Sequence, residues 1–210
     1  MLDYNNNSLA DNIDKIYHLE PKIKRAFILI DRKYFVPKGM KHLAYKLEPL
    51  PIIEEQWLSS PLSVAKMTTI LDLNGVDSVL EIGCGSGYQS AILSRIVRRV
   101  FTIERIKRLY LEAKERFKFL SLTNINVRYG DGLNGWQQFA PYDRILFSAS
   151  LSEIPNKVIL NLKEGGYLVA PIEKKNGEQN IIRFIKLNNR LYLDKSFDKC
   201  QFVPIKSLKN

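Results

Sequence analysis

Between Pro61 and about Pro171, short apolar segments alternate with longer segments of helical periodicity. The expected strands are residues 78–82, 99–103, 124–129, 144–149 and 167–172. The helices expected around them are residues 60–73, 87–97, 105–120 and 156–162. This alternation is typical of a parallel sheet built from β-α-β units. It predicts an α/β fold with a doubly wound, mostly parallel sheet.

The two ends of the chain differ from this core. Residues 23–35 have apolar residues at helical spacing, and residues 36–53 are interrupted by three prolines and a glycine, which predicts an N-terminal helical cap. Residues 181–187 and 190–197 flank an Asn-Asn pair at 188–189, which predicts a hairpin. This hairpin would give the sheet an antiparallel C-terminal edge.

The chain is expected to form one domain, because 210 residues suit a single α/β core and no repeat or long linker divides them. Its expected parts are the cap (1–60), the core (61–175) and the C-terminal hairpin with its tail (176–210).

Few residues could bind a metal or form a disulfide framework. The cysteines are Cys84 and Cys200, and the histidines are His18 and His42, so we expect no metal site and no histidine-based triad. No apolar run approaches the roughly 20 residues of a membrane span, and the first residues do not resemble a signal peptide. We expect a monomer in the cytoplasm, away from membranes.

The chain is basic, with 32 Lys and Arg against 22 Asp and Glu and a net charge of +10. Such a balance suits a nucleic-acid partner or merely acidic proteins. Because the basic residues are spread along the chain, solvated helix faces explain them better than a nucleic-acid surface. A nucleic-acid partner stays open but is not favoured.

A glycine-rich turn follows the first expected strand in the sequence SVLEIGCGSGYQS, residues 78–90. In a doubly wound sheet, ligands bind at the carboxyl ends of the strands, where such a turn lets them approach the backbone. The pattern is G-x-G-x-G, and Tyr88 stands where a dinucleotide fingerprint has its third glycine, so NAD and FAD are disfavoured. The residues expected to hold the ligand here are Gly83, Gly85, Ser86, Gly87, Tyr88 and Gln89.

Acidic residues stand at the ends of the first three expected strands. Glu81 could meet a cationic ligand, and Glu104, followed by Arg105, is placed to accept hydrogen bonds from ribose hydroxyls. Asp131, followed by Gly132, either meets an adenine amino group or satisfies its own turn. Two acids without a lysine suit a nucleoside that carries an amino-acid tail instead of phosphates. S-adenosylmethionine fits this description.

These residues resemble the protein-L-isoaspartate O-methyltransferase family over about residues 24–205. The matching motifs are FVP (35–37), LAY (43–45), LPI (50–52), VLEIGCGSGYQSAILS (79–94), GDGLNGW (130–136), APYDRILFSA (140–149), EIP (153–155), GGYLVAPI (165–172) and FVPI (202–205). The first long motif occurs in many methyltransferases, whereas GDGxxGW with APYD and the terminal FVPI is much more specific. The resemblance implies a Rossmann-like methyltransferase fold.

The resemblance also implies a reaction, in which S-adenosylmethionine methylates the side carboxylate of L-isoaspartyl residues in damaged proteins or peptides. The family's substrate serine corresponds to Ser59, which would orient that carboxylate, with Gln56 and Leu58 beside it. Ser60, directly before Pro61, suits the cap of the next helix and leaves Ser59 free. The tail around Val203 would offer backbone groups to an extended peptide.

The substrate side departs from the family pattern within the Ile53–Ser59 loop. Trp57 replaces a threonine and Leu58 an isoleucine, while Ile53 and Glu55 stand where the family has glycines. Trp57 is either an apolar lid or part of the packing. Two alternatives therefore stay open: a methyltransferase acting on RNA or another nucleophile, and a cofactor-binding paralogue without isoaspartyl activity.

Overall fold

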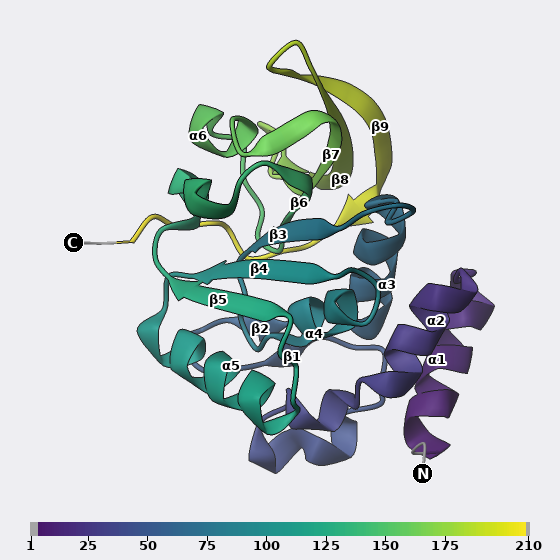
Figure 1. The fold of residues 1–210 in the computed structure, drawn as a ribbon. Coiled ribbons are helices and arrows are strands. Elements are labelled where there is room, and N and C mark those ends of the chain that lie inside the picture. The colour runs from purple at the N-terminus through teal and green to yellow at the C-terminus, as the bar shows by residue number, and fades with distance from the viewer. Residues whose placement is uncertain (1–3, 209–210) are drawn as a thin grey trace.

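The computed structural model of the chain describes residues 4–208, a sheet flanked by helices with a long hairpin at one edge (Figure 1). The helices are α1 (Tyr4–Ile16), α2 (Pro21–Leu29), α3 (Pro61–Ile70), α4 (Tyr88–Ser94), α5 (Lys107–Phe119) and α6 (Asn156–Ile159). The strands are β1 (Leu50–Pro51), β2 (Trp57–Leu58), β3 (Ser78–Ile82), β4 (Arg99–Glu104), β5 (Ile125–Tyr129), β6 (Tyr142–Phe147), β7 (Leu162–Glu173), β8 (Gln179–Leu187) and β9 (Arg190–Cys200).

The main sheet has the strand order β5-β4-β3-β6-β7-β8-β9. The strands from β5 to β7 are parallel to one another, and β8 pairs antiparallel with both β7 and β9. The predicted doubly wound sheet with an antiparallel edge is confirmed. The chain leaves β3 toward β4 on one side and later returns to place β6 on the other side. A ligand site is therefore expected at the carboxyl end of β3, where the strand order reverses.

The central strand β3 is buried along its whole length, as expected for a parallel strand covered on both faces. The cap helices α1 and α2 lie together beside α3 and α4, away from the β8–β9 hairpin (Figure 1). Their apolar residues, such as Ile13 and Phe27, join one core cluster with Tyr88 of α4 and Phe117 of α5. The cap is thus packed against the helices that follow the glycine turn.

The predicted hairpin is confirmed, with Leu187 paired to Arg190 across a two-residue turn. Asn188 and Asn189 have φ values of 51° and 59°, as a type I′ hairpin turn requires. The carboxylate of Glu164 accepts hydrogen bonds from both of their N–H groups, at 2.9 and 2.8 Å. This contact from β7 supports a turn that asparagine adopts less readily than glycine.

The expected helices are shorter than their apolar patterns suggested, and two of the breaks have a clear physical reason. The helix expected over residues 156–162 ends at Ile159, because Leu162 pairs with Tyr142 and already belongs to β7. The pattern at 23–35 is split after Leu29, and Asp31 caps a new 3₁₀ turn, η1 (Arg32–Tyr34), by accepting from the Lys33 N–H. Periodicity alone did not show either break.

The short hairpin β1–β2 was not expected, since Pro51 lies within it. It pairs Leu50 with Leu58 and carries Trp57 and Leu58 to the neighbourhood of α3. Over residues 4–208, no helix combines the length and apolarity that membrane crossing requires.

Candidate functional site

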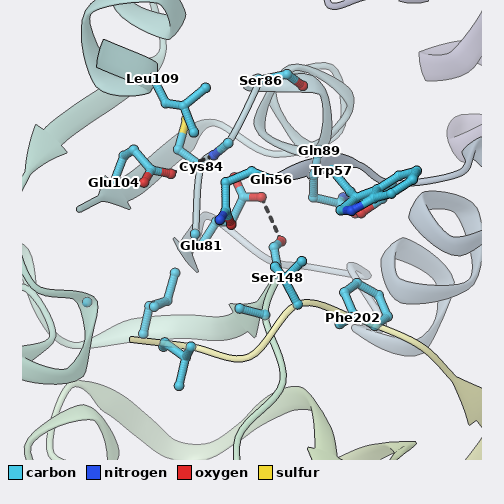
Figure 2. Close-up of a pocket in the computed structure, with 18 of the residues that line it drawn as sticks. Gln56, Trp57, Glu81, Cys84, Ser86, Gln89, Glu104, Leu109, Ser148 and Phe202 are labelled. Carbon is cyan, nitrogen blue, oxygen red and sulfur yellow. Dashed lines mark hydrogen bonds between the residues drawn. The ribbon is translucent and has the colours of Figure 1, made fainter. Parts of the chain in front are cut away.

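A pocket opens at the carboxyl ends of β3, β4 and β6, where the fold predicts a ligand site. Thirteen of the predicted site residues line it: Gln56, Leu58, Ser59, Glu81, Gly83, Gly85, Ser86, Tyr88, Gln89, Glu104, Arg105, Gly132 and Val203. Gly87 and Asp131 are not among the residues that line this pocket. Figure 2 shows the side chains around the pocket.

The glycine turn is built from left-handed backbone. Gly83 and Gly85 have φ values of 97° and 54°, which side chains disfavour. The N–H groups of Gly83 and Cys84 both donate to the carbonyl of Ile103, so the turn is fastened to the end of β4. A Cβ placed on Gly85 would meet no atom within 4 Å, so at this glycine the backbone borders open space.

Glu104 connects β4 to this turn. Its carboxylate accepts hydrogen bonds from the Gly85 N–H at 2.7 Å and from the Ile106 N–H at 2.9 Å. Burial raises the pKa of Glu104, and these backbone donors act in the opposite direction. The carboxylate is therefore held by the backbone in a fixed position on the pocket wall.

Glu81 is fully buried beneath the glycine turn. Three hydroxyls donate to its carboxylate, from Ser90, from Thr102 at 3.1 Å and from Ser148 at 2.8 Å (Figure 2 shows the Ser148 bond). Burial raises the pKa of Glu81 to about 7, although the three hydroxyls favour the ionised form. The side chain is thus poised to change charge near neutral pH.

Tyr88 and Gly87 face the body of the protein more than the pocket. The Tyr88 ring lies against Phe27 and Phe35 in the cap, and its hydroxyl is buried without a hydrogen-bond partner. A Cβ on Gly87 would come within 2.6 Å of the Phe117 ring, so this glycine permits α4 to approach α5.

Asp131 satisfies its own turn. Its Oδ1 accepts from the Leu133 N–H at 2.9 Å, and its Oδ2 accepts from the Leu208 N–H at 3.3 Å. Gly132 lines the pocket and packs so closely on Ile82 that a Cβ would come within 2.4 Å of its side chain. The structure thus places Gly132 in the pocket and uses the Asp131 carboxylate as a cap.

Ser59 and Ser60 have separate environments. The Ser60 hydroxyl accepts a hydrogen bond from the Ser63 N–H at 3.0 Å and caps α3, as predicted. The Ser59 hydroxyl has no hydrogen-bond partner among residues 4–208, and this residue borders both the pocket and an adjoining hollow. The hollow extends the site past Pro49, Ser63 and Gln201.

Trp57 and Phe202 lie at the end of the pocket away from Glu104 (Figure 2). Trp57 is 51% exposed, although Leu58 beside it is buried. The tail that carries Phe202 returns from β9 and lies beside the loop after β6. There the Val203 carbonyl accepts from the Ser150 N–H and the Ile205 N–H donates to the Ser150 carbonyl, both at 2.8 Å.

Several lining residues were not predicted from the sequence, among them Ser63 and Met67 of α3, Leu109 of α5, and Ser148. Ser148 carried a usable signal, because it directly follows β6, the strand that neighbours β3. The α3 and α5 residues had no such signal in the sequence. Within residues 4–208, no group of three or more His, Cys, Asp and Glu side chains is arranged to hold a metal ion.

The family model for protein-L-isoaspartate(D-aspartate) O-methyltransferase matches residues 4–210. A protein-L-isoaspartate O-methyltransferase of Helicobacter pylori (strain G27) is 54% identical over 200 residues, which are 95% of each chain.

Solved structures of proteins with the same name share the fold of this chain. A protein-L-isoaspartate O-methyltransferase structure is 29% identical with a TM-score of 0.87; the match covers 96% of this chain, which spans 66% of that one. A putative protein-L-isoaspartate O-methyltransferase from Plasmodium falciparum, solved with S-adenosyl-L-homocysteine, is 22% identical with a TM-score of 0.82, and the match covers 97% of this chain and 99% of that one.

Proposed function

The chain belongs to the protein-L-isoaspartate(D-aspartate) O-methyltransferase family, and we propose how its own residues carry out the family's reaction. The enzyme uses S-adenosylmethionine to methylate the side carboxylate of L-isoaspartyl residues in proteins or peptides. The observation that supports our assignment of roles is the unpartnered Ser59 hydroxyl, which borders the same pocket as the glycine turn and Glu104.

The pocket residues fit S-adenosylmethionine. Gly85 leaves open space at its α-carbon, and the carboxylate of Glu104 is fixed beside it to accept ribose hydroxyls. Glu81 lines the pocket below the turn, and its ionised form, which the three neighbouring hydroxyls favour, suits the cationic ammonium group of the amino-acid end. The bound cofactor supplies an electrophilic methyl group. We propose that Gly83, Gly85, Ser86, Gln89, Arg105 and Gly132 complete its binding site.

Tyr88, Gly87 and Asp131 support this site indirectly in our proposal. The Tyr88 ring and Gly87 fix α4 against the cap and α5. Asp131 holds the turn that brings Gly132 to Ile82. Their contribution to cofactor binding is then the placement of backbone, because the Tyr88 ring and the Asp131 carboxylate are engaged elsewhere.

The substrate needs little chemical activation. A carboxylate with a pKa near 4 is ionised at neutral pH and can attack without a general base. The enzyme's residues must therefore align it, and alignment of this kind is worth on the order of 7–11 kcal/mol. We propose that the Ser59 hydroxyl donates a hydrogen bond to this carboxylate and holds it toward the pocket.

The peptide backbone would lie along the C-terminal tail. Within the described chain the Val203 N–H has no hydrogen-bond partner, while its carbonyl is already bonded to Ser150. The Val203 N–H is thus available to a peptide carbonyl, in the manner of an added strand. Gln56 and Leu58 would form the opposite side of this groove.

The test is methyl transfer from labelled S-adenosylmethionine to a short isoaspartyl peptide, with the matched aspartyl peptide as control. Transfer to the isoaspartyl form alone is expected. No transfer, with cofactor binding established by calorimetry, would mean that the altered Ile53–Ser59 loop has redirected or ended the reaction. RNA would then be tested as the acceptor.

We further propose that the enzyme acts as a monomer in the cytoplasm. The pocket is assembled from one chain, so the reaction requires no second copy. Cys84 and Cys200 are both free thiols, as is usual in a reducing compartment. Sedimentation and cell fractionation would test the two statements.

A further inference from the structure

Arg32, the first residue of η1, is a fully buried arginine. Its guanidinium makes no ion pair with a carboxylate within residues 4–208 and bonds to backbone carbonyls instead. A buried charge is costly unless other groups replace its water. The groups that surround this guanidinium therefore indicate what it does.

Four carbonyl oxygens surround the guanidinium. Its Nη1 donates to those of Ala44 and Lys46 at 3.0 and 3.1 Å, and its Nη2 donates to those of Glu48 and Ser59, both at 3.1 Å. These carbonyls lie 12 to 27 residues further along the chain. One planar side chain thus fixes both ends of the segment 44–59, which contains the β1–β2 hairpin.

The same guanidinium contacts the cofactor side of the molecule. Its central carbon lies 5.8 Å from the centroid of the Tyr88 ring. Tyr88 is the first residue of α4 and directly follows the glycine turn. Arg32 therefore connects the backbone of Ser59 with the helix that begins at this turn.

Ser59 depends on this connection more than its neighbours do. Ser60 is fixed by capping α3, whereas the Ser59 side chain has no hydrogen bond of its own within the described chain. Its carbonyl accepts from Arg32 at 3.1 Å, and this bond holds the backbone between Leu58, which is paired with Leu50, and Ser60. Rotation about this backbone would move the hydroxyl away from the pocket it borders.

We propose that Arg32 is a positioning residue for methyl transfer, which holds Ser59 and the segment 44–59 in a fixed arrangement relative to the glycine turn. The proposal rests on the proposed function, in which Ser59 meets the substrate carboxylate. Lysine keeps the charge but is a point donor on a flexible stem and cannot span four carbonyls as the guanidinium does. The variant Arg32→Lys therefore separates geometry from charge.

The experiment compares Arg32→Lys and Arg32→Met with Arg25→Met, which removes an exposed arginine from α2 of the same cap. We expect Arg32→Lys to lower kcat/KM for an isoaspartyl peptide at least tenfold. The calorimetric Kd for S-adenosylhomocysteine should change less than threefold. Arg32→Met should lose more activity, and Arg25→Met should behave as the wild type.

Three results would overturn the proposal. One is an unchanged kcat/KM in folded Arg32→Lys. Another is an equal loss of cofactor affinity and of kcat/KM, because that would reflect general damage to the domain. The third is failure of Arg32→Lys to fold by circular dichroism, since the residue would then be needed for the whole structure.

Hydrogen exchange gives a readout that does not depend on activity. In Arg32→Lys, amides of residues 44–60 should exchange at least tenfold faster, while those of residues 88–94 stay unchanged. If the wild type does not methylate the isoaspartyl peptide, the proposed function fails and this exchange still decides the role of Arg32. Exchange that is unaltered, or accelerated in both segments alike, would refute it.

Discussion

The backbone N–H of Gly85 donates a hydrogen bond to Glu104 Oε2 at 2.7 Å, which joins the glycine turn after β3 to the end of β4. The acid therefore has two tasks. It fixes the backbone that the cofactor must approach, and its remaining lone pairs are available to ribose hydroxyls.

Glu104→Gln should weaken the binding of S-adenosylhomocysteine by about tenfold to a hundredfold, since hydrogen bonds to a charged acceptor are worth about 1.5–3 kcal/mol. Calorimetry would measure the change. Glu115→Gln, at an exposed position of α5, is the matched control and should bind as the wild type does. Unaltered affinity in Glu104→Gln would remove the ribose assignment.

Ser59→Ala should lower activity and Ser60→Ala should lower stability, although the two residues are adjacent. Loss of the Ser59 hydroxyl should reduce kcat/KM for the isoaspartyl peptide about tenfold to a hundredfold and leave cofactor affinity intact. Loss of the Ser60 cap should lower the free energy of unfolding by about 1 kcal/mol. Kinetics and urea unfolding on both variants decide this. Equal kinetic effects would contradict the division of roles.

Local patterns in the sequence predicted much of the fold. The strand expected at 78–82 is β3, and the Asn-Asn hairpin is present, because alternation and turn residues act over short distances. The end of α6 could not be predicted in this way. Leu162 leaves the helix to pair with Tyr142, a contact 20 residues away in the chain that periodicity does not contain.

In the site too, local sequence predicted the position of a residue but not its distant contacts. A motif places residues at the end of a strand, but it does not say which way each side chain points. The Tyr88 ring lies against the cap, and the Asp131 carboxylate caps its own turn. Arg32 had no signal at all, because its four carbonyl partners are brought together only by the folded segment 44–59.

Glu81 should make stability depend on pH. The unfolded chain releases this proton near pH 4.5, whereas burial raises the pKa in the folded protein to about 7. The folded state therefore binds more protons between these values, and its stability falls as pH rises through them, by about 3 kcal/mol at most. Above pH 7 this penalty is constant.

Glu81→Gln should remove that fall, because the amide stays neutral and the three neighbouring hydroxyls can rotate to serve it. Urea unfolding at pH 5 and pH 8 gives the comparison, with Glu115→Gln as the control. Stability profiles that run parallel in the wild type and Glu81→Gln would show that Glu81 does not titrate in this range.

Trp57 should report peptide binding. It is half-exposed at the pocket mouth, whereas the other tryptophan, Trp136, is buried against Phe101. An isoaspartyl peptide that covers Trp57 should shift the fluorescence of this residue. Trp57→Phe should lose this shift and keep the fluorescence of Trp136. A response of equal size in Trp57→Phe would assign Trp57 to packing and not to a lid.

The turn between β1 and β2 carries strain that glycine should relieve. Glu54 and Glu55 have φ values of 59° and 55°, and the Gln56 N–H donates to the Ile53 carbonyl, as in a type I′ turn. Left-handed backbone costs a residue with a side chain about 1–2 kcal/mol, and a glycine at that position avoids this cost. Glycine also raises the conformational entropy of the unfolded chain, which offsets part of the stabilisation. Glu55→Gly should therefore raise the free energy of unfolding by up to about 1 kcal/mol. Glu153→Gly, at an exposed bend without positive φ, should lower it instead. If both variants lose stability equally in urea unfolding, the turn is not strained.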